Sequence, residues 1–452
     1  PRGFFGAGVD EPNAKMQVVI NGHSEPNINA TEIELVDGLS ATSQNCWPSV
    51  EFDVGAINNF LNRFFPAGFY YKTFMWPKSF WYKVYEPFIR KAAGLGVASL
   101  EKDNERYEHK YEFCDLLVTG SGPAGLASAY SAAKNGAKVI LAEDKPRFGG
   151  TLLTDDVTID NLSGKEWADK MISELKEMPN VIVKNRSQVF GYYDHNMMVM
   201  FERTGDHLEK KSKYTPRQRL WYIRAKEVLL STGSIERPIV FGNNDTPGVF
   251  LSAAAKEYIK VYGVLIGKKP LIFTNNDSAY ETAIEFKKNG VEPLVLDTRE
   301  DCNSELINEA KDLKIDIRFS HAVLAANGYK KVKSATIGKL NNDKTDFVST
   351  EIIDCDCICV SGFWTPTVHL ASQSGNKLRF NDEIDAFVPD KSKQNENSIG
   401  SSNGTFTLKE TLENSFKLGA EVSNKITNKN EQILLPKSNE RKYSTHDKFW
   451  CS

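Results

Sequence analysis

The feature that most constrains the fold is a glycine-rich turn that joins a short apolar segment to a helix-forming one. A second apolar segment, 137–142, follows and ends on Glu143. In this order of strand, turn, helix, strand and acid, one glycine permits the sharp turn, a second admits a pyrophosphate, and a third lets the helix pack against the strand. The pattern predicts a dinucleotide-binding unit. Its turn residues are Gly120, Ser121, Gly122, Pro123, Ala124 and Gly125.

The acid and the helix narrow the choice of nucleotide. The helix N-terminus offers N–H groups and the positive end of its dipole to phosphate. Glu143 is placed to accept hydrogen bonds from a ribose hydroxyl, and its charge disfavours the 2′-phosphate of NADP, although Lys145 and Arg147 lie nearby. NAD and FAD both present a free ribose, so this stretch leaves both open. Further cofactor-binding residues are predicted in neighbouring segments: Asp144, Gly149, Gly150, Thr151, Val189, Thr232, Gly233, Arg237 and Gly400.

A second unit with the same order of elements begins at Pro270 and lacks the glycines. Asn275, Asn276 and Asp277 stand at its turn, and its second strand ends on Asp297. We expect Asp277 to cap the following helix and to repel a pyrophosphate by about 1–4 kcal/mol. The sequence therefore predicts one dinucleotide in this chain, and a second Rossmann-like unit without one.

Composition excludes several classes of function. The 452 residues suffice for two or three domains. The net charge of −3 and the short apolar runs predict neither nucleic-acid binding nor a membrane span. The chain begins at Pro1, which suggests a fragment or a processed product.

The seven cysteines are sparse and odd in number, which favours a reducing, cytoplasmic setting. Cys355, Cys357 and Cys359 alternate, and we expect them to share one face of a strand from Ile352 to Val360 as small buried hydrophobes rather than metal ligands. The sequence contains no CxxC, which counts against a disulfide oxidoreductase.

Two stretches before the glycine turn are unusual. From Phe60 to Phe88, 13 of 29 residues are aromatic, and both a core and a partner interface remain open for this block. Residues 101–111 are highly charged and are predicted to form a linker or a solvated helix. Strand-and-turn patterns occur earlier, at 16–22 and 33–38.

These patterns predict an α/β fold in which a degenerate Rossmann-like domain is inserted into a dinucleotide-binding domain. Ser401 stands where two-domain flavoproteins place an aspartate that holds the flavin's ribityl chain, which weakens FAD and leaves NAD plausible. The predicted divisions are an N-terminal β-rich α+β region with the aromatic block, 1–105; the dinucleotide-binding domain, 106–250 and 366–430; the inserted domain, 251–365; and a polar tail, 431–452.

Longer strings of residues are much more specific than the glycine turn. Those at 43–49, 68–77, 191–196 and 274–280 resemble the alpha subunits of heterotetrameric sarcosine oxidase, and the resemblance extends over nearly the whole chain. It implies NAD at the first site, with FAD as the alternative there. In the assembled complex it implies FAD on a beta subunit, FMN between alpha and beta, and further small subunits. The tetrahydrofolate-binding half of alpha is not contained in this chain.

The resemblance implies an oxidoreductase acting on CH–NH donors, which converts sarcosine, oxygen and tetrahydrofolate to glycine, hydrogen peroxide and methylene-tetrahydrofolate. The chemistry would belong to a partner subunit, which leaves this chain as a nucleotide-holding scaffold. The alternatives are an FAD-binding subunit of a related amine, opine or proline dehydrogenase, and a stand-alone NAD(P)H:flavin-type reductase. The sequence offers no acid–base pair or nucleophile that identifies catalytic residues, and His195 is interpreted as a structural turn residue.

Overall fold

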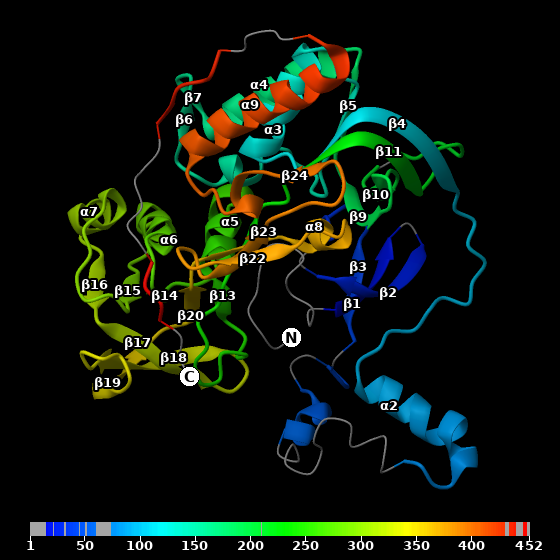
Figure 1. Cartoon of the computed structure of the whole chain (residues 1–452). Helices are drawn as coiled ribbons and strands as arrows, with labels where there is room; N and C mark the ends of the chain where they lie inside the picture. Colours follow the sequence, from blue (N-terminus) through cyan, green and yellow to red (C-terminus); the bar gives the residue numbers. More distant parts are fainter. Residues whose placement is uncertain are drawn as a thin grey trace. The chain divides into compact units, whose positions relative to one another are not determined.

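The computed structural model describes residues 15–449, except 21, 31, 32, 45, 50, 51, 60–73, 209, 430–433 and 440–445. The chain forms two compact units. One unit holds the residues up to Glu105 together with Asp206–Lys210, and the other holds the remainder (Figure 1).

The first unit is built on an antiparallel sheet of order β2-β1-β3, with β1 Lys15–Ile20, β2 His23–Asn29 and β3 Ser40–Ser43. The β1–β2 hairpin confirms the strand and turn predicted at 16–22. The strand predicted at 33–36 is wrong, because these residues form no strand and Leu35 is 85% exposed. A short apolar run that stays in solvent gains no free energy from burial, and β3 takes the place beside β1.

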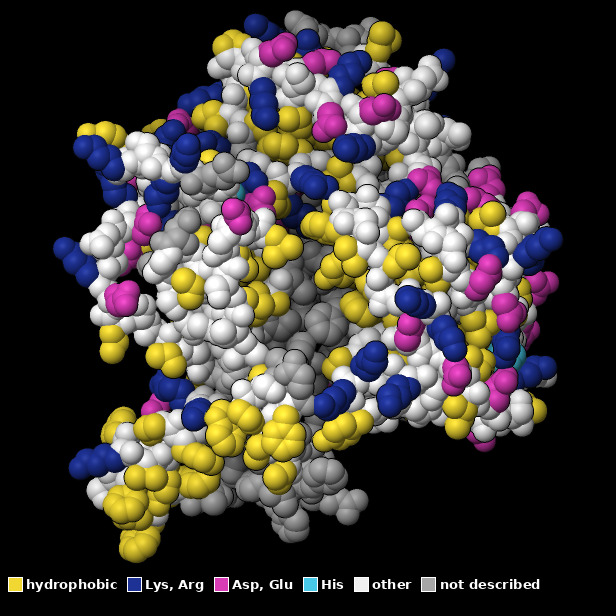
Figure 2. All heavy atoms as spheres, turned by 180° about the vertical axis from the view of Figure 1, so that it is seen from behind, with side chains coloured by type: hydrophobic (Ala, Val, Ile, Leu, Met, Phe, Trp, Pro, Cys, Tyr) yellow, Lys and Arg dark blue, Asp and Glu magenta, His cyan; other side chains and the backbone are white. Residues whose placement is uncertain are grey.

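The described part of the aromatic block lies on the surface of the first unit. Its short helices are η1 Val54–Asn59, η3 Lys78–Phe80, η4 Trp81–Tyr85 and α2 Glu86–Ala92. Trp76, Tyr82 and Phe88 are 83%, 83% and 70% exposed, and α2 buries no residue. Figure 2 shows the resulting hydrophobic surface at lower left. Residues 60–73 of the block lie outside the described residues.

The second unit contains a sheet of order β8-β5-β4-β11-β10-β9, with β24 beside β11. Its strands are β4 Tyr107–Thr119, β5 Val139–Ala142, β8 Val181–Lys184, β9 Ser187–Tyr193, β10 Met197–Arg203, β11 Gln218–Leu230 and β24 Glu396–Ser398. β4 and β11 are long, curved strands that pair in parallel (Figure 1). The linker or helix predicted at 101–111 is therefore wrong from Tyr107 onward, because alternating exposure along β4 suits a strand that extends beyond the core.

Three helices cover one face of this sheet: α3 Pro123–Lys134, α4 Gly164–Glu177 and α9 Leu408–Thr427 (Figure 1). α3 and α9 approach closely because their contact is made of small residues. A Cβ on Gly419 would lie 2.4 Å from the carbonyl oxygen of Ser128, and the Ser131 hydroxyl donates to the carbonyl of Phe416 at 2.6 Å. Short elements complete this side: η5 Gly150–Leu153, β6 Thr158–Ile159, β7 Leu162–Ser163, β25 Ser438–Asn439 and η6 Gly400–Asn403.

The degenerate Rossmann-like unit is a parallel sheet of order β13-β20-β14-β15-β16. Its elements are β13 Val249–Leu251, α5 Ser252–Tyr262, β14 Pro270–Thr274, α6 Ser278–Lys288, β15 Leu294–Asp297, α7 Glu305–Asp312, β16 Asp316–Phe319 and β20 Cys357–Ser361. An antiparallel meander, β17 His321–Gly328, β18 Val332–Leu340 and β19 Phe347–Asp354, precedes β20. The remaining elements are β12 Ser234–Glu236, β21 Trp364–Pro366, α8 His369–Gln373, β22 Leu378–Asn381 and β23 Ala386–Pro389.

The single strand predicted from Ile352 to Val360 is wrong. β19 ends before Cys355 and β20 begins at Cys357, so the chain changes sheets between them. Asp356 makes this crossing by accepting hydrogen bonds from the backbone N–H groups of residues 268 and 269. All three cysteines are buried, as expected for small hydrophobes. No described helix has both the length and the apolar character that crossing a membrane requires.

Candidate dinucleotide site

The glycine turn lies between the end of β4 and the start of α3. Gly120 has a φ of +95°, and the Ser231 hydroxyl donates to the carbonyls of Thr119 at 2.6 Å and Gly120 at 2.8 Å. A Cβ on Gly125 would lie only 1.9 Å from the carbonyl oxygen of Gly120. The fold itself therefore requires both Gly120 and Gly125.

Gly122 has a different role from the other two glycines. Its φ is −64°, which any residue adopts, and a Cβ placed there would meet no atom within 4 Å. It is the N-cap of α3, where a helix presents free N–H groups and a positive dipole end. The space in front of Gly122 therefore fits a pyrophosphate, and a side chain at this position would fill it.

Loops from other strands meet at this edge of the sheet. The N–H of Gly149 donates to the carbonyl of Ser121 at 3.1 Å. A Cβ on Gly150 would lie 2.9 Å from the Cα of Gly122, and a Cβ on Gly400 would lie 2.8 Å from the Cβ of Ala124. The structure thus brings together the turn residues and the predicted loop glycines, with Thr151 exposed beside them.

Glu143 ends β5 and faces the glycine turn. Its carboxylate accepts hydrogen bonds from the N–H of Ser121 at 2.8 Å, the hydroxyl of Ser121 at 2.5 Å and the N–H of Lys145 at 3.0 Å. The side chain is buried, and burial together with the neighbouring Asp144 raises the pKa of Glu143 to about 7 against the opposing effect of Ser121. The carboxylate thus holds the turn and β5 together at the ribose end of the site.

This pKa predicts a pH dependence of stability. Folded Glu143 keeps its proton up to about pH 7, whereas the unfolded chain releases it near the ordinary value of 4.5. The free energy of unfolding therefore falls as pH rises through this window. Glu143→Gln has no proton to release, so above pH 7 it should gain up to about 3 kcal/mol on the wild type. Urea unfolding at pH 5, 6, 7 and 8 measures this difference, and parallel profiles for the two proteins would contradict the assignment.

Lys145 and Arg147 turn away from the ribose end toward α5. Lys145 pairs with Glu257 at 3.4 Å, and Arg147 donates to the carbonyl of Val261 at 3.3 Å. Their charges are thus engaged with the inserted unit. This arrangement gives a 2′-phosphate little to offset its repulsion by Glu143.

The remaining predicted residues divide into two groups. Thr232 follows β11, its hydroxyl donates to the carbonyl of Thr367 at 2.9 Å, and Gly233 beside it has a φ of +75°. Val189 is half-buried on β9 and packs against the core. Arg237 donates to the carbonyls of residues 384 and 385 at 3.1 and 2.8 Å, so these bonds run to the turn between β22 and β23 rather than to the glycine turn.

The second turn is closed by a buried arginine. Arg299 pairs with Asp277 at 2.8 Å and with Asp297 at 2.7 Å, and all three side chains are almost fully buried. The expectation that Asp277 caps α6 is wrong, because its side chain makes no capping hydrogen bond. The amide oxygen of Asn276 accepts from the N–H of Ser278 at 3.0 Å instead, which leaves the Asp277 carboxylate to the guanidinium.

Sequence reasoning missed these charges and a second buried network. Lys256 on α5 pairs with Asp155 at 2.7 Å and with Glu281 on α6 at 2.5 Å. Asp155 follows η5, so the network ties the loop beside the glycine turn to the inserted unit. The partners lie about 100 and 25 residues apart in sequence, and no local pattern marks them. The one available signal for Arg299 is its place two residues after Asp297.

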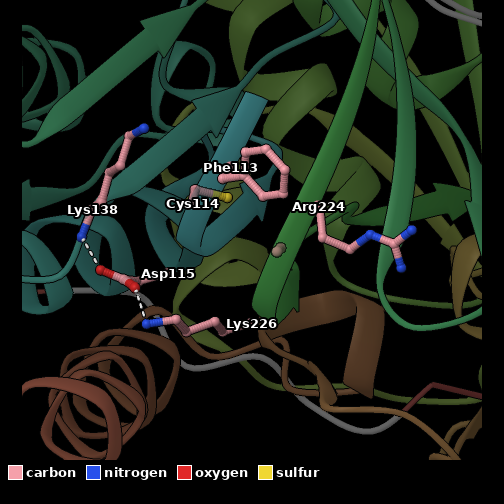
Figure 3. A pocket seen from close by; sticks show the side chains of 7 residues that line it. Phe113, Cys114, Asp115, Lys138, Arg224 and Lys226 are labelled. Atoms are coloured by element: carbon pink, nitrogen blue, oxygen red, sulfur yellow. Dashed lines mark hydrogen bonds and ion pairs between the residues drawn. The ribbon is translucent and has the colours of Figure 1, made fainter. Parts of the chain in front are cut away.

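A depression of about 260 Å³ lies at the other end of β5 and carries no candidate chemistry. Figure 3 shows Asp115 between Lys138 and Lys226. Asp115 pairs with Lys226 at 2.8 Å and accepts from the N–H of Lys138 at 2.8 Å. Burial raises the pKa of Cys114 to about 12, so its thiol stays protonated. Within the described ranges, no group of three or more His, Cys, Asp or Glu side chains is arranged to hold a metal.

Comparison with known proteins places these features in a family. The family described as Pyridine nucleotide-disulphide oxidoreductase matches residues 114–396. The sarcosine oxidase subunit alpha of Rhizobium meliloti (strain 1021) is 42% identical over 389 residues, which cover 86% of this chain and 38% of that protein. The subunit alpha of Corynebacterium sp. (strain U-96) is 31% identical and covers 89% of this chain and 37% of that protein. The chain thus spans about two fifths of the length of these curated relatives.

The crystal structure of L-proline dehydrogenase from P. horikoshii superposes with a TM-score of 0.58 at 18% identity, covering 92% of this chain and 65% of that chain. At this identity the likeness shows the fold alone, and it agrees with the predicted α/β class. The chain therefore belongs to the pyridine nucleotide-disulphide oxidoreductase family, and it is a homologue of sarcosine oxidase subunit alpha.

Proposed function

We propose that this chain is the NAD-binding part of an alpha subunit in a multi-subunit flavoenzyme that oxidatively demethylates sarcosine. A flavin-bearing partner would carry the chemistry that yields glycine, hydrogen peroxide and methylene-tetrahydrofolate. The role of this chain would be to hold the nucleotide and to position that partner. The similarity to sarcosine oxidase alpha subunits over 86% of the chain is the observation that carries the proposal.

The geometry of the two turns supports one bound dinucleotide. The first turn has open space at Gly122, whereas the second is closed by the pairs of Arg299 with Asp277 and Asp297. A stand-alone reductase needs a flavin and a separate nicotinamide nucleotide, so one closed turn argues against that alternative. The turn Gly400–Asn403 offers the hydroxyls of Ser401 and Ser402 and no carboxylate for a ribityl chain, which favours NAD over FAD.

A turnover assay tests the proposal. The purified chain alone should not oxidise sarcosine, and the chain combined with its flavin-bearing partner should release hydrogen peroxide when sarcosine is added. A matched reaction without sarcosine serves as the control. Turnover of sarcosine by the chain alone would contradict the proposal, because it would require a flavin and a catalytic base in this chain.

The exposed aromatic surface predicts where the partner binds. Trp76 is 83% exposed, and aromatic anchors supply much of the energy of protein interfaces. Trp76→Ala should weaken association with the flavin-bearing subunit by about 2 kcal/mol, roughly 30-fold, without changing the melting temperature. Calorimetric titration of the two subunits measures this effect.

The matched control for Trp76 is Trp167, which lies 3% exposed in α4. Trp167→Ala should lower the melting temperature, because it leaves a cavity in the core. If Trp76→Ala lowers the melting temperature and leaves association unchanged, the aromatic block belongs to a core. Tyr70 and Tyr71 of the same block lie outside the described residues.

A further inference from the structure

A short segment of the tail lies over the second Rossmann-like unit. In open parallel sheets, nucleotides bind in the crevice beyond the carboxyl ends of the strands. In this unit the residues just after β20, β14 and β15 mark that crevice, and they include Phe363, Asn275 and Thr298. The segment 446–449 contacts all three of them.

Asp447 makes the central contacts. Its N–H donates to the carbonyl of Asn275 at 2.9 Å, and the side-chain amide of Asn275 donates to the carbonyl of Asp447 at 2.7 Å. The Asp447 carboxylate accepts from the hydroxyl of Thr298 at 3.4 Å and pairs with Lys344 of the β18–β19 loop. A buried Asn275 thus pairs with the backbone of the tail in both directions.

The residues on either side of Asp447 extend the contact. The ring of His446 stacks on Phe363 with centroids 4.2 Å apart and an interplanar angle of 7°. Lys448 pairs with Asp385 at 2.9 Å and donates to the carbonyl of Asp382 at 2.9 Å. Phe449 is 6% exposed. Each residue of the segment therefore has a built contact, and Figure 1 shows the segment in red beside β14.

The floor of the crevice suits a peptide better than a pyrophosphate. Asn276 and Asp277 are 2% and 1% exposed, and the two aspartates that pair with Arg299 outnumber its single positive charge. The indole N–H of Trp364 donates to the hydroxyl of Ser278 at 3.2 Å, at the N-terminus of α6. Side chains thus occupy the place where a phosphate would meet the helix.

We propose that the crevice of the second unit is a peptide-binding site, and that residues 446–449 of this chain are its ligand. The recognition chemistry is a backbone pairing at Asn275, an aspartate held by Lys344 and Thr298, and an aromatic stack on Phe363. The segment keeps the second unit closed to nucleotides. The claim goes beyond the proposed function, because it does not depend on which nucleotide the first site holds.

Hydrogen exchange of the full chain, followed by mass spectrometry, tests the proposal. In the wild type, the amides of 446–449 should exchange at least tenfold more slowly than in a free peptide of the same sequence. The double variant Asp447→Ala, Phe449→Ala should release the segment and speed exchange at 275–278 by at least tenfold. Exchange at 117–126, in the first glycine turn, should not change. Leu434→Ala is the matched control in the same tail, because Leu434 is 92% exposed.

Two results would overturn the proposal. The first is exchange of 446–449 in the wild type at the rate of the free peptide. The second is a double variant in which 446–449 exchanges freely while 275–278 stays as slow as in the wild type. Because all these readouts lie in the second unit, they do not depend on occupancy of the first site. Failure of the proposed function would appear instead in the turnover assay.

Discussion

Replacing Gly122 with valine is expected to empty the dinucleotide site while the chain stays folded. Gly122 has an ordinary φ, and a Cβ there meets no protein atom within 4 Å. The valine side chain would instead fill the space that a pyrophosphate takes at the N-terminus of α3. We expect nucleotide affinity to fall at least about 100-fold, or about 2.7 kcal/mol. Equilibrium binding of NAD together with thermal unfolding measures both parts of this prediction.

Gly125→Ala provides the contrast. Its Cβ would lie 1.9 Å from the carbonyl oxygen of Gly120, so α3 and the turn would have to separate. This variant should unfold at a lower temperature, and its loss of nucleotide should accompany its loss of structure. If Gly122→Val binds nucleotide as tightly as the wild type, the pyrophosphate does not pass in front of Gly122 and the site is misplaced.

Arg299→Met is expected to be strongly destabilising. Its guanidinium is the partner of two carboxylates, those of Asp277 and Asp297, and both of those side chains are 0% exposed. Removing one partner of a buried ion pair leaves an uncompensated charge and costs about 3–5 kcal/mol. Urea unfolding of the full chain measures the loss. Adding Asp277→Asn and Asp297→Asn to the same variant should recover part of it, because no buried charge then remains.

The matched control for Arg299 is Arg379, an exposed residue of β22. Arg379→Met should change stability by less than about 0.5 kcal/mol, because surface substitutions away from specific contacts have small effects. A loss below about 1 kcal/mol for Arg299→Met would show that water or another group screens the two carboxylates.

The first unit of the argument, the glycine turn, could be predicted from the sequence because its chemistry is local. Strand, turn, helix and acid follow each other within residues 113–143, and the spacing of the glycines states their roles. The structure separates those roles further. Gly120 and Gly125 serve the fold, and Gly122 leaves space for a ligand. The second unit was recognisable for the same reason, since β14, α6 and β15 repeat that order.

The features that the sequence did not predict depend on contacts between distant segments. The partners of Asp277 depend on how β15 lies beside β14, so a local helix-capping rule assigned its carboxylate wrongly. The tail shows no hydrophobic period, yet Asp447 and Phe449 find a site about 170 residues earlier in the chain. The charged start of β4 was misread because its strand pattern needs β11 as a partner. In each case tertiary contacts outweighed the local pattern.

The most direct test of the account is the identity and amount of nucleotide released from the purified chain. The chain should be colourless and release one equivalent of NAD on denaturation, and titration with further NAD should fill no second site. Gly122→Val prepared in the same way should release none. One equivalent of FAD with no NAD would contradict the account, because the same turn would then hold a flavin and the chain would carry redox chemistry of its own.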